Sequence, residues 1–259
     1  MEIKFYQVDA FTGEVFKGNP AGVCPLETEL PDDLMQRIAF ENNLSETAFI
    51  VSKEGRLHIR WFTPECEVIL CGHATLASAH VLFRHEGFTG HILEFQSKSG
   101  PLRVTDKGDI LELDFPAETL SPCEADPSIE KALGKKPVET YSGMDMMAVF
   151  EKESDIAGFR PDFRELMNVK ARGVIVTAKG DSCDFVSRFF GPQVGIDEDP
   201  VTGSAHCKLI PYWHAKTGKK MMTARQLSKR GGLLFCAMDA DRVKIAGKAV
   251  TYLEGVIRL

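Results

Sequence analysis

The sequence predicts an α+β fold made of two lobes of similar size. Strand-like segments with alternating apolar residues outnumber helix-like segments, and short glycine-bearing turns separate several of them. This pattern favours a mixed, partly antiparallel sheet over a regular alternation of strand and helix. A proline-rich stretch at 114–128 lies near the middle of the chain and is typical of a linker. A segment of the first half also recurs in the second half, which indicates that the lobes are related.

The alternation of apolar and polar residues predicts the strands of both halves. In the first half these segments are 3–11, 46–53, 56–62, 92–96, 102–106 and 110–115, and in the second half they are 173–178, 184–190, 242–247 and 250–259. Helical spacing predicts helices at 31–43, 73–86, about 126–133, about 161–167 and 204–216. Pro211 falls inside the last helix, where we expect it to kink or interrupt the helix because it removes a backbone hydrogen bond.

Composition excludes several classes of protein. The net charge of -6 and the lack of a concentrated Lys/Arg stripe argue against a nucleic-acid surface. No apolar run is long enough to span a bilayer, and the opening "MEIKFYQVDA" lacks the apolar stretch of a signal peptide. With 44% hydrophobic and 26% charged residues, the sequence predicts a soluble, cytoplasmic protein without a membrane partner.

The cysteines and the familiar cofactor motifs point to neither a metal nor a nucleotide. The seven cysteines are odd in number and scattered, so we expect free thiols. The tightest Cys/His group is Cys66, Cys71 and His73, and its spacing matches no common zinc arrangement. "GEVFKGNP" lacks the lysine of a phosphate loop, and no G-x-G-x-x-G, H-E-x-x-H or G-x-S-x-G is present. We therefore expect no metal and no cofactor.

The recurring segment is a strand, loop and helix unit. "RWFTPECEVILCGHATLASAHVLFRHEG" begins at Arg60, and "RFFGPQVGIDEDPVTGSAHCKLIPYWHAKTG" begins at Arg188. Each starts Arg-aromatic-Phe-x-Pro and passes through acidic residues to a Gly-(His/Ser)-Ala turn. In each, 15 positions separate the turn glycine, Gly72 or Gly203, from the glycine that ends the segment. This match predicts two equivalent helix starts in a duplicated fold.

Two equivalent helix starts facing one cleft would hold a carboxylate from two sides. The free N–H groups and the positive dipole end at a helix start stabilise an anion by up to ~2 kcal/mol. The alternative is that Gly72 and Gly203 only allow tight turns, with Ser204 as an ordinary N-cap. A matched pair of turns with acidic residues beside both favours the binding interpretation.

Four motifs resemble the PhzF-like proteins, a family named for the phenazine-biosynthesis isomerase and related in fold to diaminopimelate epimerase and proline racemase. They are "GNPAGVC", "NLSETAF", "RWFTPECEVILCGHAT" and "EDPVTGSAH", and the resemblance runs from about residue 5 to the final "LEGVIRL". It implies two pseudo-symmetric lobes, each a bent mixed sheet around a central helix, with the active site in the cleft between them. The lobes would be 1–117 and 118–249, with the segment about 250–259 returning to the first.

The resemblance also suggests a chemistry. Related epimerases and racemases use one thiol on each face of the substrate. Cys71 occupies the first of these positions, but Thr202 occupies the second, and a hydroxyl is too weak an acid for that task. Two-thiol racemisation is therefore disfavoured, and we expect Cys71 to be packed and inert.

The PhzF-like pattern supplies carboxylates instead. Glu46 matches the family's catalytic acid/base, and His73 and Asp199 match the polar groups beside it. Gly72, Gly203 and Ser204 match substrate-binding positions, and we group Asn19 with them at the rim of the cleft. Without the resemblance, Glu46 would be a solvated loop acid or a helix cap. Glu67 and Glu198 are the remaining acids of the repeats, and we interpret them as solvated or supporting groups.

The sequence therefore predicts a cofactor-independent isomerase that acts on a small carboxylate-bearing metabolite by proton transfer. One alternative is an epimerase or racemase that uses a carboxylate and a histidine in place of thiols. Another is a catalytically inactive protein kept as a metabolite-binding or interaction module. Assembly into a homodimer is left open, and the sequence does not identify the substrate.

Overall fold

The computed structural model describes residues 1–259 and divides into two compact units. Unit 1 consists of Met1–Phe115 and Lys244–Leu259, and unit 2 consists of Pro116–Val243. The expected lobe boundary lay after residue 117, and the observed boundary lies after Phe115. The chain returns to unit 1 at Lys244, earlier than the expected position of about 250.

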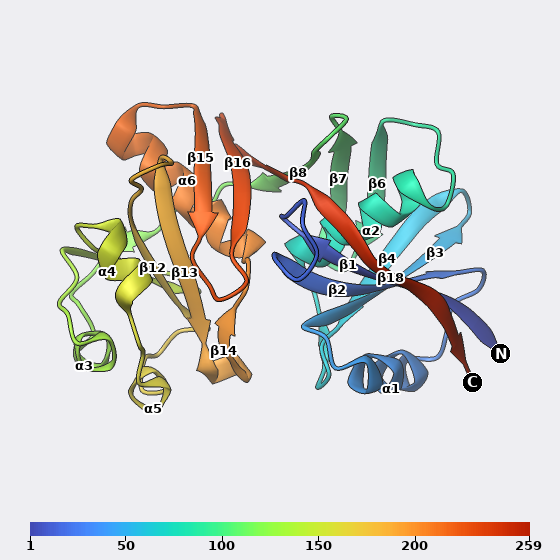
Figure 1. Cartoon of the computed structure of the whole chain (residues 1–259), viewed down its shortest axis with the longest axis horizontal. Coiled ribbons are helices and arrows are strands. Elements are labelled where there is room, and N and C mark those ends of the chain that lie inside the picture. The colour runs from blue at the N-terminus through green and yellow to red at the C-terminus, as the bar shows by residue number, and fades with distance from the viewer. The chain divides into compact units, whose positions relative to one another are not determined.

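Unit 1 is a mixed sheet with two helices (Figure 1). In chain order its elements are β1 (Glu2–Ala10), β2 (Asn19–Leu26), α1 (Asp32–Asn42), β3 (Glu46–Lys53), β4 (Arg56–Phe62), β5 (Glu67–Val68), α2 (Gly72–Arg84), β6 (Ile92–Ser97), β7 (Gly100–Asp106), β8 (Leu111–Pro116) and β18 (Ala249–Arg258). The strand β1 pairs with β18 and β2, and the sheet continues through β3, β4, β6, β7 and β8. The pairs β2–β3 and β4–β6 are parallel, and the other pairs of this series are antiparallel.

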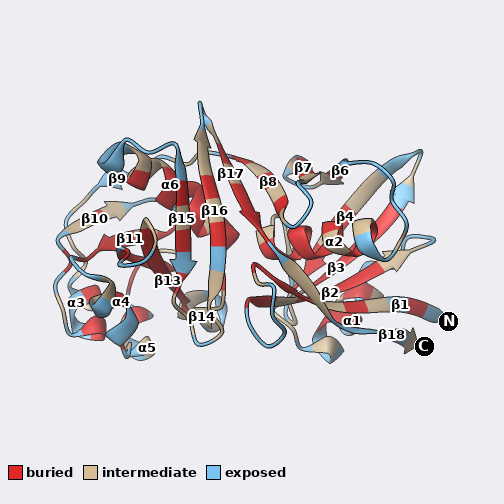
Figure 2. Cartoon of the chain, turned by 45° about the horizontal axis from the view of Figure 1, so that its top comes forward, coloured by how far each residue is buried: buried red, intermediate tan, exposed pale blue.

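The helix α2 is the buried centre of unit 1. It packs against β1, β2, β3, β7 and β18, and nine of its 13 residues are buried (Figure 2). Its small residues Ala74, Ala77 and Ala79 are each 0% exposed, because strands approach the helix from several sides. The helix α1 instead packs through Met35 and Ile38 on a separate cluster of buried residues that includes Phe49.

Unit 2 is a second mixed sheet with its own central helix. Its elements are β9 (Ser121–Pro122), α3 (Pro127–Leu133), β10 (Glu139–Ser142), β11 (Met146–Val149), α4 (Glu153–Gly158), α5 (Phe163–Leu166), β12 (Val174–Lys179), β13 (Phe185–Gly191), a single 3₁₀ turn at Pro192–Val194, β14 (Ile196–Asp199), α6 (Gly203–Thr217), β15 (Met221–Gln226) and β16 (Gly232–Asp239), and β17 (Arg242–Gly247) spans the unit boundary. Strands are ordered β9, β10, β11, β12, β13, β15 and β16.

The two units share one pattern of strand pairing, which confirms the pseudo-symmetric α+β fold expected from the sequence. In unit 1 the pairs β2–β3 and β4–β6 are parallel and enclose the antiparallel pair β3–β4. In unit 2 the pairs β11–β12 and β13–β15 are parallel and enclose the antiparallel pair β12–β13. The short strands β5 and β14 pair with β4 and β13, and each leads into the central helix of its unit.

The helix α6 runs from Gly203 to Thr217, so the interruption considered for Pro211 does not occur. Pro211 has no N–H to donate to the carbonyl of Cys207, four residues earlier. That carbonyl accepts a hydrogen bond of 2.9 Å from the backbone N–H of Glu118 instead. The proline therefore leaves no buried carbonyl unpaired, and the helix continues through it.

Several elements were absent from the sequence prediction. The largest omission in unit 1 is β2, which lies between β1 and β3 although it contains Pro20, Gly22 and Pro25. In unit 2 the omissions are β10, β11, α4, β14, β15 and β16. The stretch expected to be a linker carries β9 and the start of α3, and the helix expected at about 161–167 is only Phe163–Leu166.

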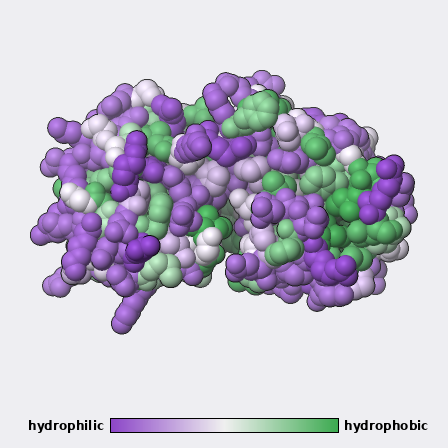
Figure 3. Space-filling view, turned by 60° about the horizontal axis from the view of Figure 1, so that its bottom comes forward, coloured by the Kyte–Doolittle hydropathy of each residue, from purple (hydrophilic) through white to green (hydrophobic).

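None of the helices combines the length and the apolar character that crossing a membrane requires. On the face drawn in Figure 3 most residues are hydrophilic, and hydrophobic ones gather in patches. The most exposed large hydrophobic side chains include Phe16, Phe40 and Met221.

Candidate active site

Glu46 is the first residue of β3 and is placed there by the end of α1. Asn43 closes α1 in the left-handed conformation, with φ 49°, and its N–H bonds the carbonyl of Ala39. Asparagine tolerates this conformation better than most residues do, which explains its place in "NNLSETAF". The chain then enters β3, where Glu46 lies opposite Ala21 of the parallel strand β2. The side chain of Glu46 is only 13% exposed.

His73 is the second residue of α2 and contacts Glu46 directly. Its Nε2 lies 3.1 Å from Oε2 of Glu46, and its side chain is 6% exposed. Neither atom has a hydrogen-bond partner of good geometry, so the contact is an ion-pair approach rather than a well-directed hydrogen bond. Glu46 and His73, which only the family resemblance placed together, are therefore neighbours in the structure.

The pKa of His73 lies well above its ordinary value. Burial by itself favours the neutral imidazole, but the neighbouring Cys71 and Glu46 favour the imidazolium and outweigh burial. Burial, with a smaller contribution from Glu46, raises the pKa of the Cys71 thiol, so this thiol is neutral near pH 7. The contacts with Cys71 and Glu46 therefore raise the pKa of His73 despite its burial.

Asn19, the first residue of β2, lies behind His73. Its Nδ2 is 3.2 Å from Nδ1 of His73. The residue is 0% exposed, whereas we expected it at the rim of a cleft. The preceding Gly18 has φ +64°, and a Cβ there would lie 2.2 Å from the carbonyl oxygen of Ala10, so only glycine fits. The amide of Asn19 can present either its nitrogen or its oxygen to Nδ1, and so can serve both protonation states of the ring.

Cys71 completes this group, since its Sγ lies 3.5 Å from Nδ1 of His73. It is buried, as expected, but it contacts the candidate catalytic histidine rather than apolar residues alone. Ligand atoms of Glu46, Cys71 and His73 lie within 4.8 Å of one another. A carboxylate, a thiolate and an imidazole are ligands that zinc accepts, although this thiol must first lose its proton.

The central helices α2 and α6 begin without a side-chain cap. Their N-cap residues, Cys71 and Thr202, make no cap hydrogen bond, and neither helix has an acidic residue in its first turn. The helices α3 and α5 are capped in the usual way by Asp126 and Asp162. Ser204 is the second residue of α6, so its interpretation as an ordinary N-cap is wrong. The side chains of Cys71 and Thr202 thus do not cap the first-turn N–H groups of these helices.

Asp199 is held in place by the loop that leads into α6. Thr202 donates a hydrogen bond of 2.5 Å from Oγ1 to Oδ2 of Asp199. Gln226, at the end of β15 and 1% exposed, donates to the carbonyl oxygen of Asp199 at 2.8 Å and to Oγ1 of Thr202 at 3.0 Å. It also accepts from the backbone N–H of Thr202 at 2.9 Å. Thr202 occupies the position equivalent to Cys71 and serves to orient the carboxylate.

Ser204 belongs to a charged network that the sequence did not reveal. Its Oγ accepts a hydrogen bond of 2.9 Å from Nη2 of Arg172. Arg172 forms a two-point contact with Asp145, which is 0% exposed, and Lys208 lies 3.1 Å from the same carboxylate. These residues are far apart in the sequence, and a charged residue is expected at the surface, so no periodic pattern marks them.

The remaining acids of the repeats have structural partners. Glu67 pairs with Arg60 through two hydrogen bonds of 2.8 Å. Glu198 pairs with Arg188 through hydrogen bonds of 2.6 and 3.0 Å. In each unit the arginine that begins the repeat is bonded to the acid that precedes the helix. These acids support the loop in both repeats.

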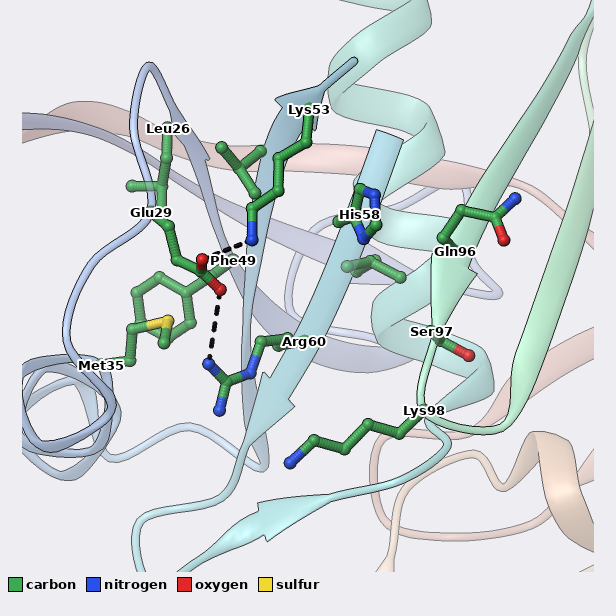
Figure 4. Close-up of a pocket in the computed structure, with 12 residues that line it drawn as sticks. Leu26, Glu29, Met35, Phe49, Lys53, His58, Arg60, Gln96, Ser97 and Lys98 are labelled. Atoms are coloured by element: carbon green, nitrogen blue, oxygen red, sulfur yellow. Dashed lines mark hydrogen bonds and ion pairs between the residues drawn. The ribbon is translucent and has the colours of Figure 1, made fainter. Parts of the chain in front are cut away.

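A separate cavity of about 280 Å³ lies in unit 1 (Figure 4). Met35 and Phe49 contribute apolar surface, and Lys53, Arg60 and Lys98 contribute charge. Each of these cations is paired with a carboxylate, of Glu29 or Glu67. Neither Glu46 nor His73 lines this cavity, so it is distinct from the group described above.

The structure thus gathers the predicted residues into one group in each unit. In unit 1 it brings together Asn19, Glu46 and His73, with Gly72 at the start of the helix. In unit 2 it places Asp199 and Ser204 on either side of the start of α6 at Gly203. No sequence pattern predicted Arg172, Asp145, Lys208 or Gln226.

Fold and site together define the class of this protein. A structure of a probable proline racemase from Agrobacterium radiobacter aligns over 99% of this chain and 92% of its own, with a TM-score of 0.68 and 10% identity. At this identity the likeness concerns the fold alone. The chain therefore has the diaminopimelate epimerase-like α+β fold, with a carboxylate and histidine at the start of one central helix.

The family follows from closer matches. The model of the family described as phenazine biosynthesis-like protein matches residues 8–255, and the chain belongs to this family. An uncharacterized isomerase of Pseudomonas aeruginosa is 52% identical over 100% of both chains. The crystal structure of a PhzF-family phenazine biosynthesis protein from Enterococcus faecalis is 49% identical, covers 100% of both chains and superposes with a TM-score of 0.98.

Proposed function

We propose that this protein is an isomerase that moves a proton within a small carboxylate-bearing metabolite without a cofactor, with Glu46 as the acid/base. The contact of Glu46 with the buried His73 is the observation that carries this proposal. The names of the relatives support the reaction class, since several are called isomerases. A carboxylate in a mostly dry site beside an imidazolium is suited to accept and return one proton.

The proposed cycle needs only one proton on Glu46. The ionised carboxylate removes a proton from a carbon of the substrate, and the electron pair of that C–H bond moves into a neighbouring π system. Glu46, now neutral, delivers the same proton to a second carbon and is ionised again. His73 holds Glu46 in place, while Asn19 and Cys71 fix the ring from its other side.

The starts of α2 and α6 are the proposed binding positions for carboxylate groups. Both lack a side-chain cap, so the backbone N–H groups near Gly72, His73, Gly203 and Ser204 have unused donor capacity. Asp199, fixed by Thr202, serves as a further polar group for the substrate. We propose that both groups of residues serve the same reaction.

The test is the turnover of the Glu46→Gln variant. The substrate is first found by screening small carboxylates for those that raise the melting temperature of the protein. Glutamine keeps the shape but cannot act as a base, so turnover should fall by about 10² to 10⁴ while folding and ligand binding persist. Glu41→Gln, an exposed substitution on α1, is the matched control and should change nothing. A folded Glu46→Gln variant with near wild-type turnover would refute the mechanism.

The product distinguishes this proposal from the alternatives. Reaction in heavy water followed by NMR shows where deuterium enters, and an isomerase should give a positional isomer. A stereoisomer labelled at the original carbon would favour an epimerase or racemase. Binding without any turnover across the screen would favour the inactive binding protein.

A further inference from the structure

Arg172 is fixed more firmly than any ordinary surface arginine. Its Nε and Nη2 each donate a hydrogen bond of 2.7 Å to the two carboxylate oxygens of the buried Asp145. The guanidinium lies over the ring of Phe189, with 5.5 Å between its central carbon and the ring centroid. The backbone N–H of Arg172 donates to the carbonyl of Met144 at 2.9 Å. A planar guanidinium held in this way has lost most of its rotational freedom before any ligand arrives.

The next residue, Gly173, makes this packing feasible. A Cβ at Gly173 would lie 2.4 Å from Cζ of Phe189 and 2.8 Å from the carbonyl oxygen of Phe190, so a side chain would displace the ring. Without one, the ring of Phe189 can lie beneath the guanidinium. Gly173 therefore allows Arg172 to stack on the ring of Phe189.

The guanidinium has N–H groups that are not used within the chain, and it sets the direction of the Ser204 hydroxyl. Nη2 donates to Oγ of Ser204, so the hydroxyl oxygen is an acceptor here and its own proton is directed elsewhere. That proton donates to no group of the chain, and Nη1 of Arg172 makes no hydrogen bond within the chain. The Arg172 side chain is 34% exposed, so these donors can reach a ligand.

The carboxylate of Asp145 is shared by two cations. It contacts Arg172 and Lys208, whose side chain is 1% exposed. Lys208 also pairs with Glu118 at 2.9 Å, and the negative charges of Glu118 and Asp199 act on Arg172 as well. Lys208 is therefore buried between two carboxylates, whereas the side chain of Arg172 is 34% exposed. Arg172 is the cation of this network that a ligand can reach.

From these contacts we propose that Arg172 is the specificity-determining residue that selects a carboxylate, binding it through Nη1 and orienting the Ser204 hydroxyl to the same group. This inference rests on the proposed function, because it assigns the carboxylate of that substrate to the Arg172–Ser204 pair. It concerns binding alone and requires no proton transfer. A failure of Glu46 as the base would therefore leave it intact.

The test uses malonate as the anionic probe and malonamide as its neutral counterpart. The full-length ¹⁵N-labelled protein is titrated with each, and the NMR signals of Arg172 Nε–H and the Ser204 amide are followed. Malonate should shift both signals saturably and malonamide should not. Arg172→Ala should weaken malonate binding by about 10-fold or more, and Arg172→Lys should restore part of it. Lys208 still pairs with Asp145 in these variants, so no buried charge is left alone.

Controls separate positioning from a general loss of structure. Arg164→Ala, an exposed arginine of α5 in the same unit, should bind malonate as the wild type does. Ser204→Ala should also weaken binding, and its effect should be less than additive with that of Arg172→Ala. With a true substrate, Arg172→Lys should raise KM more than it lowers kcat. Wild-type-like malonate affinity in a folded Arg172→Ala variant, or equal binding of malonamide, would overturn the proposal, as would the absence of any malonate binding.

Discussion

Cys71 lies beside the proposed catalytic residues, but its thiol is not suited to proton transfer. It lies 3.5 Å from His73, yet burial raises the pKa of its thiol, and Thr202 occupies the equivalent position in unit 2. A neutral thiol is a poor nucleophile and a poor base. Its contact with His73 instead helps to fix the imidazole ring.

We expect Cys71→Ala to retain most of the turnover of the wild type. The loss should be less than about 10-fold, because Glu46 and His73 keep their contact and only packing is removed. The measurement is kcat on the identified substrate, with circular dichroism as the check on folding. A loss as large as that of Glu46→Gln in a folded variant would restore the thiol mechanism.

The raised pKa of His73 predicts a pH-dependent contribution to stability. A group whose pKa is raised by folding contributes stability that is fully present below its unfolded value of about 6.5, and that is lost as pH rises through the folded value. We therefore expect the contribution of the Glu46–His73 pair to fall as the solution becomes alkaline. The urea midpoint of the wild type should drop more between about pH 6 and about pH 9 than that of His73→Gln. Parallel curves for the two proteins would contradict this.

At the scale of elements, the two repeats support their helix starts with the same kind of arginine–carboxylate pair. Each places an arginine on a strand and bonds it to the acid that precedes the central helix. The surroundings differ, since the side chain of Arg60 is 19% exposed and that of Arg188 is 9% exposed. Arg188 also donates to the carbonyl oxygens of Ile156 and Phe159 at 3.1 and 3.0 Å.

This difference predicts that equivalent substitutions of the two arginines lower the free energy of unfolding by unequal amounts. Arg188→Ala leaves two carbonyls and a partly buried carboxylate without their donor, so it should lower the free energy of unfolding by about 3 kcal/mol or more. Arg60→Ala should cost about 1 kcal/mol, because Lys98 remains on Glu67 and solvent is near. Urea unfolding of both variants measures the difference. Equal costs would show that the extra carbonyl contacts of Arg188 contribute little.

At the scale of the whole molecule, unit 1 is closed by the last strand of the chain. The strand β18 pairs antiparallel with β1 along its whole length, from Glu2 opposite Arg258 to Ala10 opposite Ala249. The N–H of Leu259 also donates to the carbonyl of Met1. Residues at the two ends of the sequence therefore complete one sheet, while unit 2 is built from a continuous segment.

Deletion of residues 249–259 should destabilise unit 1 selectively. The backbone groups of β1 that face β18 would lose their partners, and α2 would lose part of its cover. Hydrogen exchange should show loss of protection at β1 and α2, with protection at β12 and β13 retained. Deletion of Arg258 and Leu259 alone should have little effect. Full protection of β1 after the longer deletion would contradict the assigned role of β18.

Local patterns were sufficient for much of the fold and for part of the site. Alternation predicted β3, β4 and β13, and helical spacing predicted α1, α2 and α6, because each of these elements buries apolar residues that recur along the sequence. The repeat predicted the equivalence of the two helix starts. The "NLSETAF" motif singled out Glu46 only through resemblance, since its local sequence is equally that of a loop acid. The strand β2 was missed because its prolines oppose the local preference for a strand, which pairing on both sides overrides.

The sequence by itself determined the α+β class, the family resemblance, the duplicated unit and the identity of Glu46, His73, Asp199 and Ser204 as candidates. Tertiary structure alone decided that Asn19 lies buried behind His73, that Glu118 satisfies the carbonyl freed by Pro211, and that Arg172 reaches Ser204 from a distant strand end. The physical reason is that periodicity reports which face of an element is buried. The partner of a buried polar group is set by strand order and register, which bring together residues that no local pattern connects.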